Sequence, residues 1–309
     1  MKKMILIVGF FLMMIFPLSV FSQQISLGIL PPLLELKIKP GKSVLVAYQI
    51  KNFGDPVYLQ ARVLPFEVKD NYGKISLKKE FSGPIKFSLD NANLQLEKPF
   101  FMPSQKSDQL LLKIKAPENI TQKDYYYSLV IETMPFINKE GVVSAQSKAS
   151  LASNILITVT ESGVIDIKPK NVIFTTGKKI FDSFESIPLT FIIANLGKNL
   201  IQPTGKIVLK GNFGEKADFE IVPKNILSQS QRLIEATPSG ELSSFKEPKT
   251  LVLPKGFFIG KYTLTTEVKF GENSPTLFAN THFYALPFKI IIGLILSLVL
   301  VIFIIKKSS

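Results

Sequence analysis

The chain of 309 residues contains no cysteine, one histidine (His282) and only two arginines, Arg62 and Arg232. The missing cysteine excludes disulfides, thiolate nucleophiles, cysteine-based zinc sites and a lipid-bearing cysteine. A single histidine excludes any histidine pair in a catalytic or metal site. Nucleic-acid surfaces favour arginine, because its planar guanidinium binds through two parallel hydrogen bonds. The net charge of +13 therefore comes almost entirely from lysine, and no nucleic-acid partner is expected.

Sequence motifs of catalysis are also missing. The sequence has no glycine-rich phosphate loop, no Gly-x-Ser-x-Gly and no His-Glu-x-x-His. Asp218 and Glu220 lie two residues apart, as a general acid and base on one strand face would, but the alternating Ile221-Val222 after them favours a solvated face. We predict no enzyme activity, no catalytic residue, no metal site and no cofactor.

The N-terminal residues 1–22 are predicted to form a secretory signal peptide. Lys2 and Lys3 make a short positive segment, and an almost unbroken apolar run follows from Met4 to Ile15. Cleavage is expected after Ser22. The alternative is an uncleaved anchor helix.

The C-terminal residues 283–305 are predicted to form a transmembrane helix. Ile290–Ile305 is sixteen residues without a charge, which spans about 24 Å at 1.5 Å per residue, slightly less than a hydrocarbon core of about 30 Å. The lysines after it indicate a cytoplasmic tail at 306–309 and an extracellular N-terminal region, in a single-pass protein of the cell membrane. The residues expected at the membrane interface are Tyr284, Phe288, Lys289, Lys306 and Lys307.

Between these ends the hydrophobic pattern has the period of two that half-buried strands require. Turn residues separate the alternating segments, and no segment outside the ends has a helical period over a dozen residues. The alternating positions include Val44–Ile50, Leu110–Ile114, Tyr125–Ile131 and Tyr262–Phe270. Short strands separated by turns predict an all-β protein of immunoglobulin-like β-sandwiches.

A weak internal repeat indicates two sandwiches in tandem. Each half has an apolar strand that ends in Asn-x-Gly, at Asn52-Phe53-Gly54 and at Asn195-Leu196-Gly197, and each has a second Asn-aromatic-Gly turn further on. We predict a first sandwich over 23–160 and a second over 161–282.

This layout resembles the WxL-interacting proteins of bacterial cell surfaces. Pro31–Leu36, Pro40–Ser43 and Tyr48–Asn52 are similar to the start of their peptidoglycan-binding domain, and Phe191–Gly197 with Pro203-Thr204-Gly205 is similar to their membrane-proximal domain. The first-half features also resemble periplasmic pilus chaperones. The resemblance implies adhesion or scaffolding, in which a membrane anchor holds a surface protein, peptidoglycan or another cell-wall polymer.

Two aromatic clusters are candidates for binding such a partner. Phe100 and Phe101 lie between two prolines, so both rings cannot easily face one core, and Tyr126 lies on the strand face opposite to Tyr125 and Tyr127. The alternative is that Phe100 packs inward and Tyr126 packs against the second sandwich. We predict a non-enzymatic surface protein that binds another surface protein or cell-wall glycan. The alternatives are a pilus-chaperone-like module that acts by strand pairing and an accessory subunit of a cell-envelope enzyme.

Overall fold

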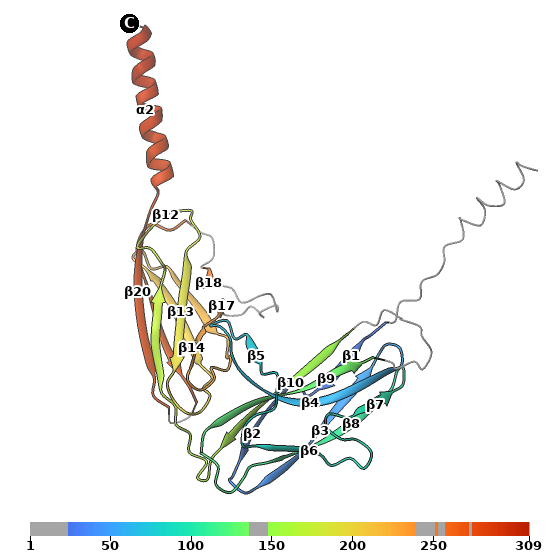
Figure 1. Ribbon diagram of the computed structural model, residues 1–309. Coiled ribbons are helices and arrows are strands. Elements are labelled where there is room, and N and C mark those ends of the chain that lie inside the picture. The colour runs from blue at the N-terminus through green and yellow to red at the C-terminus, as the bar shows by residue number, and fades with distance from the viewer. Residues whose placement is uncertain (1–23, 136–147, 239–250, 253–256, 272–273, 309) are drawn as a thin grey trace, which may run out of the picture.

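The computed structural model describes residues 24–135, 148–238, 251–252, 257–271 and 274–308. The expected signal peptide lies outside these residues. The described chain forms two β-sandwiches followed by one helix, and Figure 1 shows them as two bodies that meet at one corner, with the helix leaving the far end of the second.

The first sandwich packs two sheets face to face. The β3 sheet has the order β1 (Leu27–Leu30), β3 (Ser43–Asn52), β8 (Ser107–Lys115) and β6 (Lys86–Leu89). The β9 sheet has the order β2 (Leu33–Ile38), β10 (Ser150–Val159), β9 (Asp124–Met134), β4 (Val57–Val68) and β5 (Ile75–Leu77), and β7 (Pro99–Met102) also pairs with β4. All these pairs are antiparallel except β2 with β10, which is parallel.

The second sandwich repeats this plan. The β13 sheet has the order β11 (Pro169–Thr175), β13 (Pro188–Asn195) and β16 (Ser230–Leu233), with β18 (Leu251–Val252) also on β13. The β19 sheet has the order β12 (Ile180–Asp182), β20 (Leu277–Leu286), β19 (Gly260–Lys269), β14 (Thr204–Gly211), β15 (Lys216–Ile221) and β17 (Ala236–Pro238). The predicted class, two tandem immunoglobulin-like sandwiches with a C-terminal helix, is confirmed.

The alternating side chains explain why each body has its own core. In β3, Tyr48 and Ile50 are fully buried against the inward residues of the facing β9 sheet, such as Tyr127 and Leu129. The second core is built in the same way around Phe191, Leu264 and Phe283. Each buried side chain of this size contributes roughly 1.5–3 kcal/mol.

The repeated Asn-x-Gly turns have the same structure in both sandwiches. The buried side chains of Asn52 and Asn195 each accept a hydrogen bond from the backbone N–H of the glycine two residues later, at 3.0 Å. A Cβ on Gly54 would lie 2.1 Å from the backbone oxygen of Gln24, and one on Gly197 would lie 2.3 Å from that of Asp166. Glycine is therefore required at both turns, because the backbone of another segment approaches closely.

The C-terminal helix α2 covers Phe288–Ser308. An 18-residue window within Phe288–Lys307 has a mean hydropathy of 3.1, and this is the one helix among the described residues that is long and apolar enough to cross a membrane. The predicted start at 283 differs from the structure, since β20 continues to Leu286, paired with β19 as far as Ala285 and with β12 as far as Leu286. Tyr284 is therefore a strand residue, and only Pro287 separates the strand from the helix.

Candidate binding groove and open strand edge

A buried carboxylate joins the two sandwiches. Asp124, at the start of β9, accepts hydrogen bonds from the Thr158 hydroxyl at 2.8 Å, the Asn199 side-chain amide at 2.7 Å and the Leu200 backbone N–H at 2.5 Å. The Tyr126 hydroxyl donates to the same carboxylate at 3.1 Å and accepts from the Ser228 N–H at 2.8 Å. The Asn199 and Leu200 donors to the carboxylate, and the Ser228 donor to Tyr126, come from the second sandwich, so Asp124 and Tyr126 couple the two bodies.

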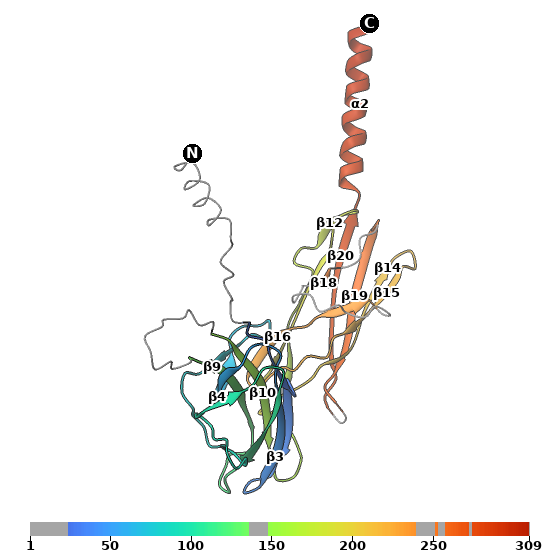
Figure 2. The same ribbon diagram turned by 90° about the vertical axis from the view of Figure 1, so that its right-hand side faces the viewer.

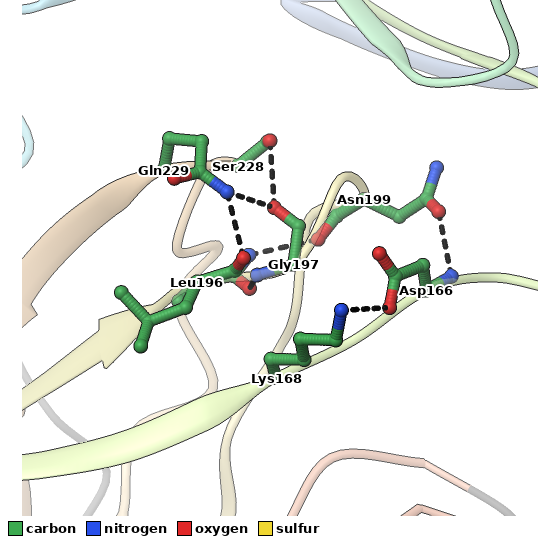
Figure 3. Close-up of polar contacts among 8 residues, drawn as sticks. Asp166, Lys168, Leu196, Gly197, Asn199, Ser228 and Gln229 are labelled. Carbon is green, nitrogen blue, oxygen red and sulfur yellow. Dashed lines mark hydrogen bonds and ion pairs between the residues drawn. The ribbon is translucent and has the colours of Figure 1, made fainter.

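The loop that carries Asn199 is itself held within the second sandwich. Figure 3 shows the Gly197 carbonyl accepting hydrogen bonds from the Ser228 hydroxyl at 2.9 Å and the Gln229 side-chain amide at 3.1 Å. On the other side, the Asp166 N–H donates to the Asn199 side-chain carbonyl at 2.8 Å. Asn199 is thus fixed through its side-chain carbonyl to the Asp166 N–H (Figure 3), and through its side-chain amide to Asp124.

A second bridge lies at the other side of the junction. The turn between β4 and β5 reaches the edge strand β16, where the Leu233 N–H donates to the Asn71 carbonyl at 2.7 Å. Arg232 packs so closely on this turn that a Cβ on Gly73 would lie 2.4 Å from its guanidinium. Gly73 also has a φ of 87°, a region that glycine enters without strain.

A groove of about 380 Å³ lies between these bridges, at the lower end of the roughly 300–1,000 Å³ of typical ligand pockets. The outer face of the β9 sheet and the segment between β15 and β16 provide its walls. The apolar lining residues are Leu33, Phe66, Val68, Ile75, Leu156, Pro223, Ile226 and Leu227. A floor of this composition suits apolar side chains of a ligand.

Polar groups sit at the rim of the groove. The Asn225 side-chain amide donates to the Glu35 carboxylate across the junction, and Lys224 forms an ion pair with Glu235 at 2.6 Å. Burial lowers the pKa of Arg232, against the raising effect of the charges on Glu235 and Asp70. The Arg232 Nη1 donates to the Asn225 carbonyl at 2.8 Å. The buried Nε of Arg232 has no hydrogen-bond partner among the described residues.

Strand β10 is paired on both sides along only part of its length. Residues 150–158 pair with β9, but β2 pairs only with 154–159. The Asn154 N–H donates toward β2, to the Pro32 carbonyl, so by the alternation of a strand the backbone groups of Ser150 and Ala152 point the same way. Within the described part of the chain, no strand pairs with β10 on that side of 150–153.

The path of the N-terminal strand explains this open edge. The chain belongs to the β3 sheet as β1 up to Leu30, and after Pro31-Pro32 it joins the β9 sheet as β2. Beside residues 150–153, β1 lies close to β10 without pairing with it, and the Ser153 hydroxyl donates to the Pro31 carbonyl at 2.7 Å. We call residues 150–153 the open edge. It ends at Asn154 and Leu33, where the groove begins.

The predicted partner-binding aromatics lie in three different environments. Tyr126 lies between the sandwiches, with its ring stacked on Phe66 at 5.8 Å, and burial together with the Asp124 charge raises its pKa. Phe100 packs on the first core, while Phe101 is 49% exposed and contacts Tyr58 at 5.3 Å between ring centroids. The inward Phe100 and the interdomain Tyr126 match the alternative stated above, and the open edge carries no sequence signal of its own.

The predicted interface residues gather at the base and the end of the helix. Tyr284 and Phe288 are about 40% exposed at the base, where Lys289 lies 3.9 Å from the Asp182 carboxylate. Lys306 and Lys307 lie in the last turn.

The acidic pair of the sequence lies on a partly exposed strand face, with Asp218 half-buried. Asp218 forms an ion pair with Lys216 at 3.3 Å, and Glu220 is exposed. In the described ranges, no three His, Asp or Glu side chains come together as a metal site would require.

Comparison with known proteins gives structural likenesses alone. No protein-family model and no curated protein matches the chain. A chain from the chaperone–tip adhesin complex of CFA/I fimbriae is 12% identical with a TM-score of 0.41, and covers 83% of this chain and 98% of its own. The class 5 fimbriae chaperone CfaA is 12% identical with a TM-score of 0.40, over 84% and 100%. The E. coli chaperone DraB is 13% identical with a TM-score of 0.38, over 85% and 98%. At such identities these likenesses concern the fold alone.

Proposed function

We propose that this chain is a non-enzymatic, membrane-anchored module that binds an extended segment of a partner protein by strand pairing at the open edge. The half-paired strand β10 carries this proposal. A partner strand beside residues 150–153 would bond the backbone groups of Ser150 and Ala152, which β2 does not reach. This is the mode of recognition in which the backbone supplies affinity and neighbouring pockets supply specificity.

The groove supports this proposal as the matching pocket. It begins at Leu33 and Asn154, where the open edge ends. A segment that pairs with β10 can therefore continue into the groove and bury an apolar side chain against Phe66 and Leu156. The rim charges Glu35 and Arg232 would then select among partner sequences.

The C-terminal helix supports the anchored part of the proposal. A helix of 21 residues is about 31 Å long, which matches a hydrocarbon core of about 30 Å. We infer that Lys306 and Lys307 face the cytoplasm and that both sandwiches lie outside the cell, since the expected signal peptide exports the chain.

A photo-crosslinking amino acid at Ser150 tests the proposal in cells that make the full chain. Ser150 is the first residue of the open edge and is exposed, so we expect a discrete crosslinked partner. Ala152→Pro should abolish this product, because proline removes the N–H that a partner strand would bond while the β9 ladder uses the neighbouring residues. Ala152→Val keeps the N–H and should keep the product.

The matched control places the same crosslinker at Lys113. This residue is exposed on β8, which is paired on both sides, with β3 and with β6. Equal products from Ser150 and Lys113, or a product unchanged by Ala152→Pro, would contradict strand pairing at the open edge.

A second candidate partner, cell-wall glycan, follows from the resemblance to the WxL-interacting family and from the exposed ring of Phe101. Aromatic rings on a surface supply contact area to sugars at low entropy cost. Phe101→Ala should then weaken binding of the full chain to purified peptidoglycan. Absence of peptidoglycan binding by the unchanged chain would leave the protein partner as the proposal, and binding unaffected by Phe101→Ala would exclude the Phe101 ring as the glycan site.

A further inference from the structure

Three exposed phenyl rings lie at the end of the second sandwich from which the helix leaves. Phe184, Phe213 and Phe257 are 55%, 74% and 52% exposed, and we call these three residues the collar. They come from the β12–β13 loop, the β14–β15 turn and the segment before β19. The rings of Phe184 and Phe257 pack on each other at 5.1 Å. Large apolar side chains gathered at one end of a domain mark an interaction surface.

The strand register places the collar at the level where the helix begins. Gly260 pairs with Ala285, and a Cβ on Gly260 would lie 3.6 Å from the Phe213 ring. Ala285 precedes Phe288 by three residues, or about 10 Å at 3.3 Å per residue. Phe184 is closer still, since it follows Asp182, which contacts the first turn of the helix.

The connection between the collar and the helix is tight. The Asp182 carboxylate accepts hydrogen bonds from the backbone N–H of Lys289 at 3.1 Å and of Phe184 at 3.2 Å. The Ser183 N–H donates to the Leu286 carbonyl at 3.1 Å. Figures 1 and 2 show the helix continuing from β20 beside β12 in both views. The collar therefore moves with the helix.

Membrane dimensions bring the collar to the lipid surface. The helix length matches the hydrocarbon core, so the core boundary falls near Phe288. The headgroup region adds roughly 5–7 Å on each side, and a phenylalanine side chain that points along the helix axis reaches it. Exposed lysines stand at the same level, at Lys179, Lys261 and Lys289, where they can bind lipid phosphates.

We propose that the helix-proximal end of the second sandwich docks on the outer surface of the membrane, with Phe184, Phe213 and Phe257 inserted among the lipid headgroups. Amphipathic surfaces with phenylalanine and lysine bind the membrane interface in this way. This inference rests on the proposed anchor and adds that the sandwich itself contacts lipid. Docking holds the module upright at a fixed height above the membrane.

Single tryptophans test the docking, because the chain contains none. Phe184→Trp and Phe213→Trp report on the collar, and Ile295→Trp reports on the helix. Phe278→Trp is the matched control, since Phe278 is 71% exposed on the same strand as Ala285 but at the far end of the sandwich. Each full-length variant is placed in phosphatidylglycerol–phosphatidylcholine nanodiscs with and without brominated lipid.

We expect brominated lipid to quench the fluorescence of the two collar variants several-fold more than that of Phe278→Trp, and their emission to shift to the blue. Quenching equal to Phe278→Trp, with Ile295→Trp still quenched, would overturn the docking and leave the anchor standing. Absence of quenching in Ile295→Trp would overturn the anchor itself. Blue-shifted collar emission without quenching would show that a protein surface covers the collar and would also overturn lipid docking.

Discussion

At the scale of single residues, Tyr127 has a deeply buried side chain; among the described tyrosines of the first sandwich only Tyr48 is less exposed. Its side chain is 2% exposed, its ring packs on Phe87 at 4.8 Å, and its hydroxyl lies where a Cβ on Gly83 would be 2.2 Å away. Burial, partly offset by a hydrogen bond with the Ile85 backbone, raises the pKa of Tyr127 to about 12. Ionisation of this side chain therefore opposes folding.

This pKa predicts a loss of stability in alkali. In the unfolded chain the phenol has its ordinary pKa of about 10, so its contribution is fully present below pH 10. It is lost as the pH rises through the folded value of about 12, by up to about 2–3 kcal/mol. Denaturant titrations of the full chain in detergent from pH 9 to 12 measure this decline in the free energy of unfolding. Tyr127→Phe should show a shallower decline, and an unchanged decline would contradict the assignment.

The neighbouring Tyr126 shows how far sequence alone could go at this scale. Its position opposite to Tyr125 and Tyr127 follows from the strand period, and this predicted an unusual environment. What covers it depends on Ser228, about a hundred residues later, and strand alternation holds no information on such a contact. The same limit applies to the open edge, which exists because two segments far apart in sequence pair only in part.

At the scale of elements, the junction of β20 with the helix depends on Asp182. Burial would raise the pKa of this carboxyl, but the N–H groups of Lys289 and Phe184 and the Lys289 charge outweigh it and lower the pKa. The folded state therefore stabilises the ionised carboxylate of Asp182. Its contribution to the free energy of unfolding is present above the unfolded pKa of about 4 and is lost as the pH falls through the lower folded pKa.

Asp182→Ala should loosen the first turn of the helix. Without the carboxylate the Lys289 and Phe184 amides lose their acceptor, so we expect several-fold faster hydrogen exchange at both amides if local opening limits the exchange. Exchange measured by NMR on the full chain in nanodiscs checks this. Glu267→Ala, which removes a half-exposed ion pair with Lys269 in the adjoining strand, should leave both amides unchanged. Unchanged exchange in Asp182→Ala would show that the cap does not hold the helix.

Strand positions were the part of the fold that the sequence predicted well. The alternating segments Val44–Ile50, Leu110–Ile114 and Tyr125–Ile131 lie within β3, β8 and β9, because one apolar face suffices to specify a half-buried strand. The outward face of β9 is also buried, at Ser128 and Val130, and the local pattern could not reveal that cover. The helix start was misplaced because apolar residues of β20 run directly into the apolar helix.

For the whole molecule, Asp124 determines whether the two sandwiches behave as one body. Asn199 and Leu200 reach it across 75 and 76 residues of sequence, so no local pattern could have predicted the junction. Hydrogen bonds to a charged group contribute about 1.5–3 kcal/mol each. The two bonds from Asn199 and Leu200 together therefore contribute about 3–6 kcal/mol, a substantial fraction of the roughly 5–15 kcal/mol that stabilises a domain.

Asp124→Ala should uncouple the sandwiches. Removing the carboxylate leaves the buried donors of Thr158, Asn199 and Leu200 unpaired, at an expected cost of about 3 kcal/mol or more. Calorimetry of the full chain in detergent should show one transition dividing into two. Asp166→Ala, which removes an ion pair with Lys168 at 3.4 Å, should cost less than about 1 kcal/mol. A single transition in Asp124→Ala would show that the groove contacts alone couple the two bodies.

The direct passage of β20 into the helix determines how the molecule would bear a mechanical load. A pull on a partner held at β10 would pass through the Asp124 junction into the second sandwich and leave it along β20. This strand is paired lengthwise with β19 over nine residue pairs and with β12 at its exit. Tension along the strand loads these hydrogen bonds in shear, all together, instead of opening them one after another. The strand that continues into α2 is thus the one placed to resist extraction from the sandwich.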